Sequence, residues 1–332
     1  MESKSYLHQK ISRACKSGSR VLPWLLPGIF LLFGMLGFIN SGYEPAVKSN
    51  QDPQFFNIYP IDLPEYLEFA GERVPLENFD TRESLDRELL VNTFFHSQTF
   101  LYLKKVPRYF PVIEPILNEY NVPEDFKYLP LVESGLANAV SPAEAVGFWQ
   151  LMEGTARDYG LEVNAEVDER YHLEKSTVAA CKYLLKSYEE YHNWTLVAAS
   201  YNNGRRGIDR QIGRQKENNY YDLLLNEETA RYIFRILALK LIVSDPEKYG
   251  FHLEEKDLYQ PIRSFEVKVD TTVSSFAEFA KNFGTNYKML KFLNPWLREP
   301  YLSNNKGKSY MIKIPGKGSR IWKLEEGSNN TE

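Results

Sequence analysis

The chain has 332 residues, of which 43% are hydrophobic and 25% charged, and its formal net charge is −4 at pH 7. This length gives room for about two domains and a terminal segment, and the apolar fraction excludes global disorder. Lysine and arginine are spread along the chain rather than gathered in one stripe, so nucleic acid is not an expected partner.

The N-terminal segment differs from the rest in charge and hydropathy. Residues 1–20 are basic, and residues 21–39 form an uncharged, largely apolar run. A run of this length can just span a bilayer as a helix, and the basic flank predicts that its N-terminal side stays in the cytoplasm. We expect a membrane anchor at 21–39, with a cleaved secretory signal as the alternative. Either way the bulk of the chain is exported, and the polar, proline-containing residues 41–63 are expected to be a linker.

A long helical region follows the linker. Apolar residues recur at helical spacing from Arg82, and no alternating strand pattern interrupts residues 80–245. The pattern therefore predicts a mainly α domain at residues 64–250. Further helices are predicted at 109–120, 123–134, 155–159, 174–192, 194–203, 207–216 and 226–244, several of them ended by a glycine.

The composition changes after Ser244. Pro246, Gly250 and Pro261 mark a boundary, beyond which the pattern predicts a small β-α-α-β module at residues 262–315. Its strands are expected at 262–269 and 310–314, and its helices at 274–283 and 286–293. Residues 316–332 are a polar tail.

Glu133 is the candidate catalytic acid. Helical spacing places Phe126, Leu129, Pro130 and Glu133 on one face, so the carboxylate shares an apolar stripe. Partial desolvation raises the pKa of a carboxyl group, and a protonated acid is what the leaving oxygen of a glycosidic bond needs. Pro130 is expected to kink this helix. The pattern alone leaves open a helix-terminal glutamate that reaches solvent or pairs with an arginine.

Four motifs then occur in order along the chain. They read Glu133-Ser134, Gly147-Phe148-Trp149-Gln150, Ser200-Tyr201-Asn202-Asn203-Gly204 and Glu228-Thr229-Ala230-Arg231-Tyr232. Together they resemble the lytic transglycosylases of the goose-type lysozyme-like class with an SLT domain, closest to the membrane-bound type D group. The resemblance implies a lysozyme-like fold, with the catalytic core at about 120–245, and it favours the catalytic interpretation of Glu133. Phe148, Glu153 and Ser200 depart from the family's usual leucine, proline and alanine, at positions that bear on substrate preference.

The same resemblance implies the chemistry and the site. The substrate would be the glycan strands of peptidoglycan, in the periplasmic part of a bacterial cell envelope. Glu133 would protonate the oxygen between N-acetylmuramic acid and N-acetylglucosamine and then deprotonate the muramic acid's own 6-hydroxyl, which leaves a 1,6-anhydro end. Tyr232 would hydrogen-bond Glu133, and Gly147 would let the backbone approach the sugar. The other residues implied to bind substrate are Ser134, Trp149, Gln150, Met152, Tyr201 and Asn202, although plain packing is an alternative for Trp149, Tyr201 and Tyr232 and an exposed turn position for Gln150.

The motifs contain no evident second carboxylate for a two-carboxylate glycosidase, although Glu144, Glu153 and Asp168 could approach in space. A muramidase that admits water is the nearest rival function, and a catalytically silent glycan-binding protein is another. The sequence has no metal-ligand spacing and no glycine-rich phosphate loop, so neither a metal nor a cofactor is expected.

The C-terminal module is similar to a LysM module, a small peptidoglycan-binding fold. The residues that carry this similarity are Val267, Asp270-Thr271, Phe276-Ala277, Leu290, Asn294-Pro295 and Ile312-Lys313-Ile314-Pro315. Val269 stands where the family usually has glycine, and Phe265 replaces its opening tyrosine. A small structural cap is therefore the alternative to a glycan-binding module.

Overall fold

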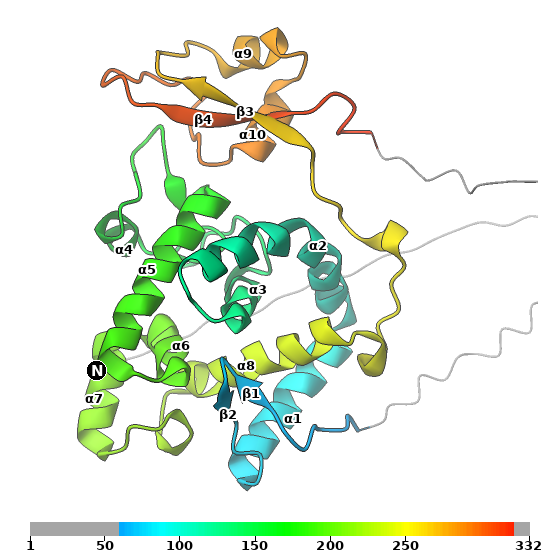
Figure 1. The fold of residues 1–332 in the computed structure, drawn as a ribbon, viewed down its shortest axis with the longest axis vertical. Helices are drawn as coiled ribbons and strands as arrows, with labels where there is room; N and C mark the ends of the chain where they lie inside the picture. The colour runs from blue at the N-terminus through cyan, green and yellow to red at the C-terminus, as the bar shows by residue number, and fades with distance from the viewer. Residues whose placement is uncertain (1–59, 322–332) are drawn as a thin grey trace, which may run out of the picture. The chain divides into compact units, whose positions relative to one another are not determined.

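The computed structural model describes residues 60–321 (Figure 1). The predictions for residues 1–20 and 21–39, and for all but the end of 41–63, lie outside this part of the chain. Within residues 60–321, no helix is both long enough and apolar enough to cross a membrane.

Residues 60–250 are mainly helical, which confirms the predicted class. A short antiparallel hairpin opens this region, and the helix patterns reappear within a few residues of their expected ends. The bounds are β1 Glu68–Phe69, β2 Glu72–Arg73, α1 Phe79–Phe94, α2 His96–Glu119, α3 Leu129–Ser134, α4 Glu153–Asp158, α5 Leu173–Tyr191, α6 Trp194–Asn203, α7 Arg205–Gln215 and α8 Glu227–Ser244. Single 3-10 turns lie at Glu124–Tyr128, Glu169–Tyr171, Tyr220–Asp222, Glu247–Tyr249 and Glu255–Asp257.

The helix predicted at 123–134 is in fact two elements. The 3-10 turn Glu124–Tyr128 comes first, and α3 begins at Leu129. Pro130 therefore lies in the first turn of α3 rather than inside a longer helix. A proline lacks an amide proton that this first turn would leave unbonded in any case. The expected kink at Pro130 is wrong for that reason: the proline helps to start a helix.

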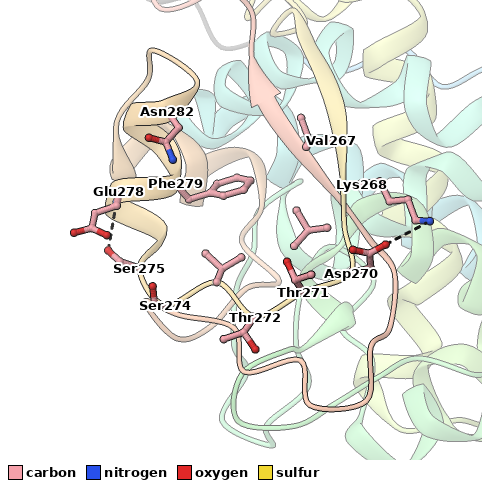
Figure 2. Close-up of a pocket in the computed structure, with 12 residues that line it drawn as sticks. Val267, Lys268, Asp270, Thr271, Thr272, Ser274, Ser275, Glu278, Phe279 and Asn282 are labelled. Carbon is pink, nitrogen blue, oxygen red and sulfur yellow. Dashed lines mark hydrogen bonds and ion pairs between the residues drawn. The ribbon is translucent and has the colours of Figure 1, made fainter.

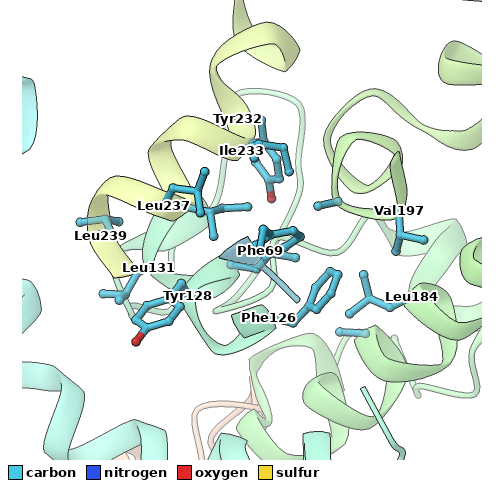
Figure 3. Packing of buried hydrophobic residues seen from close by; sticks show 14 of the residues in the cluster. Phe69, Phe126, Tyr128, Leu131, Leu184, Val197, Tyr232, Ile233, Leu237 and Leu239 are labelled. Atoms are coloured by element: carbon cyan, nitrogen blue, oxygen red, sulfur yellow. The ribbon is translucent and has the colours of Figure 1, made fainter. Parts of the chain in front are cut away.

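Helices α1, α3 and α6 pack against α8, which runs through the main hydrophobic core (Figure 3). Tyr232 and Leu237 of α8 are almost completely buried, together with Phe69 of β1 and Phe126 of the first 3-10 turn. The Phe126 ring lies 5.3 Å from the rings of both Phe69 and Trp194, centroid to centroid. Each large apolar side chain buried in this way stabilises the fold by about 1.5–3 kcal/mol. The core thereby fixes α8, which carries Glu228, Tyr232 and Arg235 of the candidate site, against α3.

The C-terminal module has the predicted β-α-α-β order. Strands β3 (Ser264–Val269) and β4 (Tyr310–Pro315) pair antiparallel, and helices α9 (Phe276–Asn282) and α10 (Tyr287–Leu293) lie between them in sequence. Ser275 and Asn286 cap the two helices, since each side chain accepts a hydrogen bond from the amide three residues on. These caps explain why two helices of only seven residues each begin where they do.

Candidate active site

Glu133 lies in the last turn of α3, next to the point where the helix ends. Gly135 ends the helix with a left-handed backbone, φ 60°, which glycine adopts without strain. The amide of Gly135 donates to the carbonyl of Leu131 at 3.0 Å, and the amide of Leu136 to that of Pro130 at 3.2 Å. These two hydrogen bonds fix the backbone at the end of α3, and the Glu133 side chain that it carries is half-buried.

Burial raises the pKa of the Glu133 carboxyl group above its ordinary value. The hydroxyl of Tyr232 donates a hydrogen bond to Oε1 of Glu133 and, with the charge of Arg235, acts in the opposite direction. The carboxylate of Glu228 adds to the upward shift. Desolvation is the largest of these effects, so the site keeps the proton on Glu133 to higher pH than an exposed glutamate would.

Tyr232 supplies its hydrogen bond from inside the core. Its side chain is 1% exposed, and burial together with the nearby Glu133 charge raises its own pKa well above the ordinary value. The phenol therefore remains a neutral donor over the physiological range. The hydrogen bond that the resemblance implied between Tyr232 and Glu133 is present in the structure.

A tight turn at residues 147–150 faces the end of α3. Val146 forms antiparallel bridges with Val140 and with Leu151, which close the base of this turn. Gln150 has a left-handed backbone, φ 47°, and its Nε2 donates to the carbonyls of Ala139 (3.1 Å) and Gly147 (2.8 Å). Both amide protons of Gln150 thus hold the turn together, and its Oε1 is left as the acceptor.

Two residues of this turn, Trp149 and Gly147, are packed against protein. Trp149 is completely buried, and its indole N–H donates to Oγ1 of Thr177 at 2.8 Å, so the ring has no face to offer a sugar. Gly147 has φ 84°, but the group that approaches it is protein: an added Cβ would overlap the carbonyl oxygen of Arg170. Packing against Arg170 is therefore sufficient to require glycine here, and the approach of a sugar to this backbone stays a prediction.

Ser134 and the 200–204 motif tie the surrounding elements together. The hydroxyl of Ser134 lies 2.9 Å from the carbonyl oxygen of Phe148, which joins the end of α3 to the turn. Tyr201 donates to the carbonyl of Trp149 at 2.7 Å. Asn202 accepts a hydrogen bond from Thr229 at 2.8 Å, so it links α6 to α8. The polar groups expected to bind sugar are thus engaged at least partly with protein.

Met152 follows the turn and is 47% exposed, so it is the one apolar side chain of the predicted set that is open to solvent. Met152 does not belong to the main hydrophobic core. An exposed thioether beside the turn is available for contact with a ligand.

The acidic neighbour of Glu133 is not one of those considered from the sequence. Asp168 is buried against Arg170, and Glu153 pairs with Arg157 at 2.8 Å. Glu228 instead influences Glu133, and it accepts a hydrogen bond from Asn202 at 3.2 Å. Glu228 precedes Tyr232 by four residues, so helical periodicity puts the two on the same face of α8 and could have identified it.

The C-terminal module contains a separate pocket of about 350 Å³ (Figure 2). It lies between the end of β3, the loop that follows and α9, and its wall is largely polar. Asp270, Thr271, Thr272, Ser275, Glu278 and Asn282 contribute to it, along with Phe279. The pocket shares no residue with the surroundings of Glu133.

Comparison with known proteins agrees with both parts of this description. Residues 111–224 match the family model of the transglycosylase SLT domain, and residues 265–318 match that of the soluble lytic transglycosylase C-terminal LysM-like domain. The chain is also 28% identical over 258 residues to proteins described as membrane-bound lytic murein transglycosylase D from Escherichia coli K12 and from Escherichia coli O6:H1. The match takes in 75% of this chain and 55% of each relative, so the chain spans about half the length of the curated relatives it matches.

Proposed function

Since the chain carries a transglycosylase SLT domain and a LysM-like domain, we propose that it is a lytic transglycosylase of peptidoglycan. It cleaves the β1,4 bond from N-acetylmuramic acid to N-acetylglucosamine and leaves 1,6-anhydro ends. The observation that carries this proposal is the half-buried Glu133, whose pKa is raised by desolvation and whose Oε1 accepts a hydrogen bond from the buried Tyr232.

One carboxyl group performs two steps in the proposed mechanism. Protonated Glu133 donates its proton to the glycosidic oxygen as the bond to the anomeric carbon breaks. The resulting carboxylate then removes the proton of the 6-hydroxyl, whose oxygen attacks the same anomeric carbon and closes the anhydro ring. Tyr232 supports the first step, because its hydrogen bond stabilises the carboxylate that Glu133 becomes when it gives up its proton. Because the 6-hydroxyl of the sugar is the nucleophile, the reaction consumes no water.

The substrate contacts of the proposal follow from the groups that the fold leaves open. Oε1 of Gln150 can accept a hydrogen bond from a sugar hydroxyl or acetamido group, and Met152 offers an exposed apolar surface. Ser134, Tyr201 and Asn202 hold the turn and α8 in place through the hydrogen bonds described above. Their main effect on substrate binding would be to hold Gln150 and Met152 in position.

The products of digestion test the proposal. Purified peptidoglycan is incubated with the full chain, and the soluble fragments are identified by mass spectrometry. Anhydro-muropeptides, which lack one water relative to reducing muropeptides, are the expected products. Reducing ends without anhydro ends would reject the transglycosylase mechanism in favour of hydrolysis. Glu133→Gln should abolish cleavage and retain binding to insoluble peptidoglycan.

Hydrolysis by a muramidase remains the second candidate because Glu228 is near enough to affect Glu133 electrostatically. In an inverting glycosidase a second carboxylate activates the water. Glu228→Gln would then abolish cleavage as completely as Glu133→Gln. The lytic transglycosylase mechanism predicts instead that Glu228→Gln still yields anhydro ends.

A purely binding role is the third candidate, and the LysM-like module bears on it. We propose that this module adds contacts to glycan strands, and its largely polar pocket would suit sugar hydroxyls. Cleavage by the unaltered chain, together with its loss in Glu133→Gln, would reject the purely binding role. Thr272→Ala in the pocket should weaken binding to insoluble peptidoglycan without changing the chemical nature of the products.

The proposed place of action is the periplasmic side of the bacterial cell envelope, where peptidoglycan lies. Residues 21–39 would anchor the chain in the inner membrane, and a cleaved signal is the alternative. Fractionation of cells that express the full chain separates these alternatives, because an anchored chain stays with the membranes in high salt.

A further inference from the structure

The C-terminal module is packed directly against the segment that precedes α5. Val167 forms an antiparallel bridge with Leu297, and the amide of Asp168 donates to the carbonyl of Trp296 at 2.9 Å. Backbone hydrogen bonds of this kind fix one segment against another in a definite register. Side-chain pairs along the same border are Glu166 with Ser303, Glu162 with Tyr310 and Lys308, and Glu174 with Lys313.

Apolar contacts reinforce this border. The hydrophobic core of the module includes Val146, Val167 and Tyr171 from the helical domain. The guanidinium of Arg298 lies over the Tyr171 ring, 3.9 Å from its centroid, and the Trp296 side chain is only 3% exposed. A module that shares its core with the neighbouring domain is held in one position, unlike a domain on a free linker.

A buried ion pair lies immediately behind the border. Asp168 is 7% and Arg170 8% exposed, and Nη2 of Arg170 lies 2.8 Å from Oδ2 of Asp168. The Nη1 atom of the same guanidinium donates to the carbonyls of Glu144 (3.3 Å) and Leu151 (3.4 Å). The planar arginine side chain has five N–H donors in a fixed fork, so it can pair with a carboxylate and also bond two carbonyls. Arg170 thus connects the module-facing segment to both ends of the turn at 147–150.

The backbone of Arg170 contacts that turn as well. Its carbonyl oxygen occupies the space where a Cβ on Gly147 would lie. Ser134, which directly follows Glu133 in sequence, contacts the turn through the carbonyl of Phe148. The turn is therefore held between Arg170 and the end of the helix that carries the catalytic carboxyl group.

We propose that Arg170 is a positioning residue, which transmits the docking of the C-terminal module to the turn at 147–150. The turn keeps its geometry next to Glu133 only while the Asp168–Arg170 pair is intact and the module is docked. This inference rests on the proposed function for its effect on catalysis. Its structural part, the order of the turn, does not depend on any activity.

Arg170→Gln in the full chain tests the proposal. It removes the charge and the forked set of N–H donors while it keeps a polar side chain. We expect the KM for soluble glycan strands to rise and kcat/KM to fall about tenfold or more, because small displacements of substrate-positioning groups cost up to about 10²-fold in rate. The pH profile of kcat should keep its shape, since Tyr232, Arg235 and Glu228 are the charged or hydrogen-bonding groups that act on Glu133. Arg170→Lys should recover part of the loss, because it restores the charge without the fork.

Lys240→Gln is the matched control. It breaks another partly buried ion pair, Lys240 with Asp125 at 2.7 Å, which joins α8 to the first 3-10 turn and does not touch the turn at 147–150. This variant should lower the thermal stability without raising KM. A rise in KM for Lys240→Gln equal to that of Arg170→Gln, or a wild-type KM for Arg170→Gln, would overturn the positioning role.

The connection to the module is tested with a border variant, Tyr310→Phe with Lys313→Met, which removes side-chain contacts to Glu162 and Glu174. If docking acts through Arg170, the border variant raises KM by itself and adds little to Arg170→Gln. Fully additive effects, or no effect of the border variant, would refute transmission from the module.

Hydrogen exchange separates this inference from the proposed function. The amides of Val146 and Leu151 donate to each other's carbonyls at 3.1 Å and should be protected in the wild type. Arg170→Gln should speed their exchange, and Lys240→Gln should not. An inactive wild-type protein would reject the proposed function, whereas unchanged exchange in Arg170→Gln would reject the positioning role alone.

Discussion

Replacing Glu133 by glutamine should stabilise the protein at neutral pH while it abolishes catalysis. Glutamine has nearly the same shape, and its carbonyl oxygen can accept the hydrogen bond that Tyr232 donates to Oε1 in the wild type. The substitution therefore removes the carboxyl group's charge and its proton, and little else. Loss of a general acid lowers kcat by about 10²–10⁴-fold.

The direction of the stability change follows from the raised pKa of Glu133, whose main cause is desolvation. A carboxyl group whose pKa is higher in the folded state contributes its full stability below the unfolded pKa. That contribution is lost as pH rises through the folded pKa, so at neutral pH the wild type carries a cost that glutamine lacks. Single stabilising substitutions commonly contribute about 0.5–2 kcal/mol, and we expect an effect of this order here. In a chain of this size each kcal/mol raises Tm by about 2–4 °C.

Thermal unfolding of wild type and Glu133→Gln at two pH values measures this effect. The variant should have the higher Tm near neutral pH, and the difference should vanish near pH 4, at about the unfolded pKa of glutamate and below it. Glu217→Gln, at an exposed position after α7, is the control for a change of net charge and should leave Tm nearly unchanged. A Glu133→Gln variant that is less stable than wild type near neutral pH would refute the desolvation of Glu133.

Three further changes test other parts of the site. Tyr232→Phe removes the hydrogen-bond donor that lowers the pKa of Glu133, so this pKa should rise. The basic limb of the pH–rate profile should then move to higher pH, and a limb that does not move would contradict this role of Tyr232. Trp149→Phe should cost about 1–3 kcal/mol in denaturant unfolding, since it removes the buried hydrogen bond to Thr177 and part of a fully buried ring. Its KM should change little, and a KM defect without loss of stability would support the sugar-binding interpretation. Gly147→Ala should lower both stability and activity, because it puts a Cβ against the backbone carbonyl of Arg170 and because Gly147 has a positive φ. A fully stable and active variant would argue against the close packing of the turn.

Local sequence patterns were reliable where local physics decides. The helices from α5 to α8 begin and end within a few residues of the predictions, because their apolar periodicity and their capping residues act over one or two turns. The β-α-α-β order of the C-terminal module was readable for the same reason. The helix at 123–134 was not, because periodicity cannot tell a kink at Pro130 from a new helix that starts there.

The roles of residues in the turn at 147–150 depended on contacts with distant segments. Trp149 meets Thr177, and Gly147 meets the backbone of Arg170, in both cases across more than twenty positions of sequence. A motif gives the residue types at such positions but not the direction from which their partners come. Contacts with distant segments of the protein therefore explain the residue types at positions 147 and 149.

The sequence by itself indicated that Glu133 lies among apolar residues and, by resemblance, that Tyr232 is its partner, and local periodicity defined the helix that carries Tyr232. The tertiary structure decided that α8 brings Glu228 and Arg235 to the same carboxyl group, and that the C-terminal module borders the turn through Asp168. The physical reason is that desolvation and charge depend on everything packed around a group, whereas periodicity and capping depend only on its neighbours along the chain.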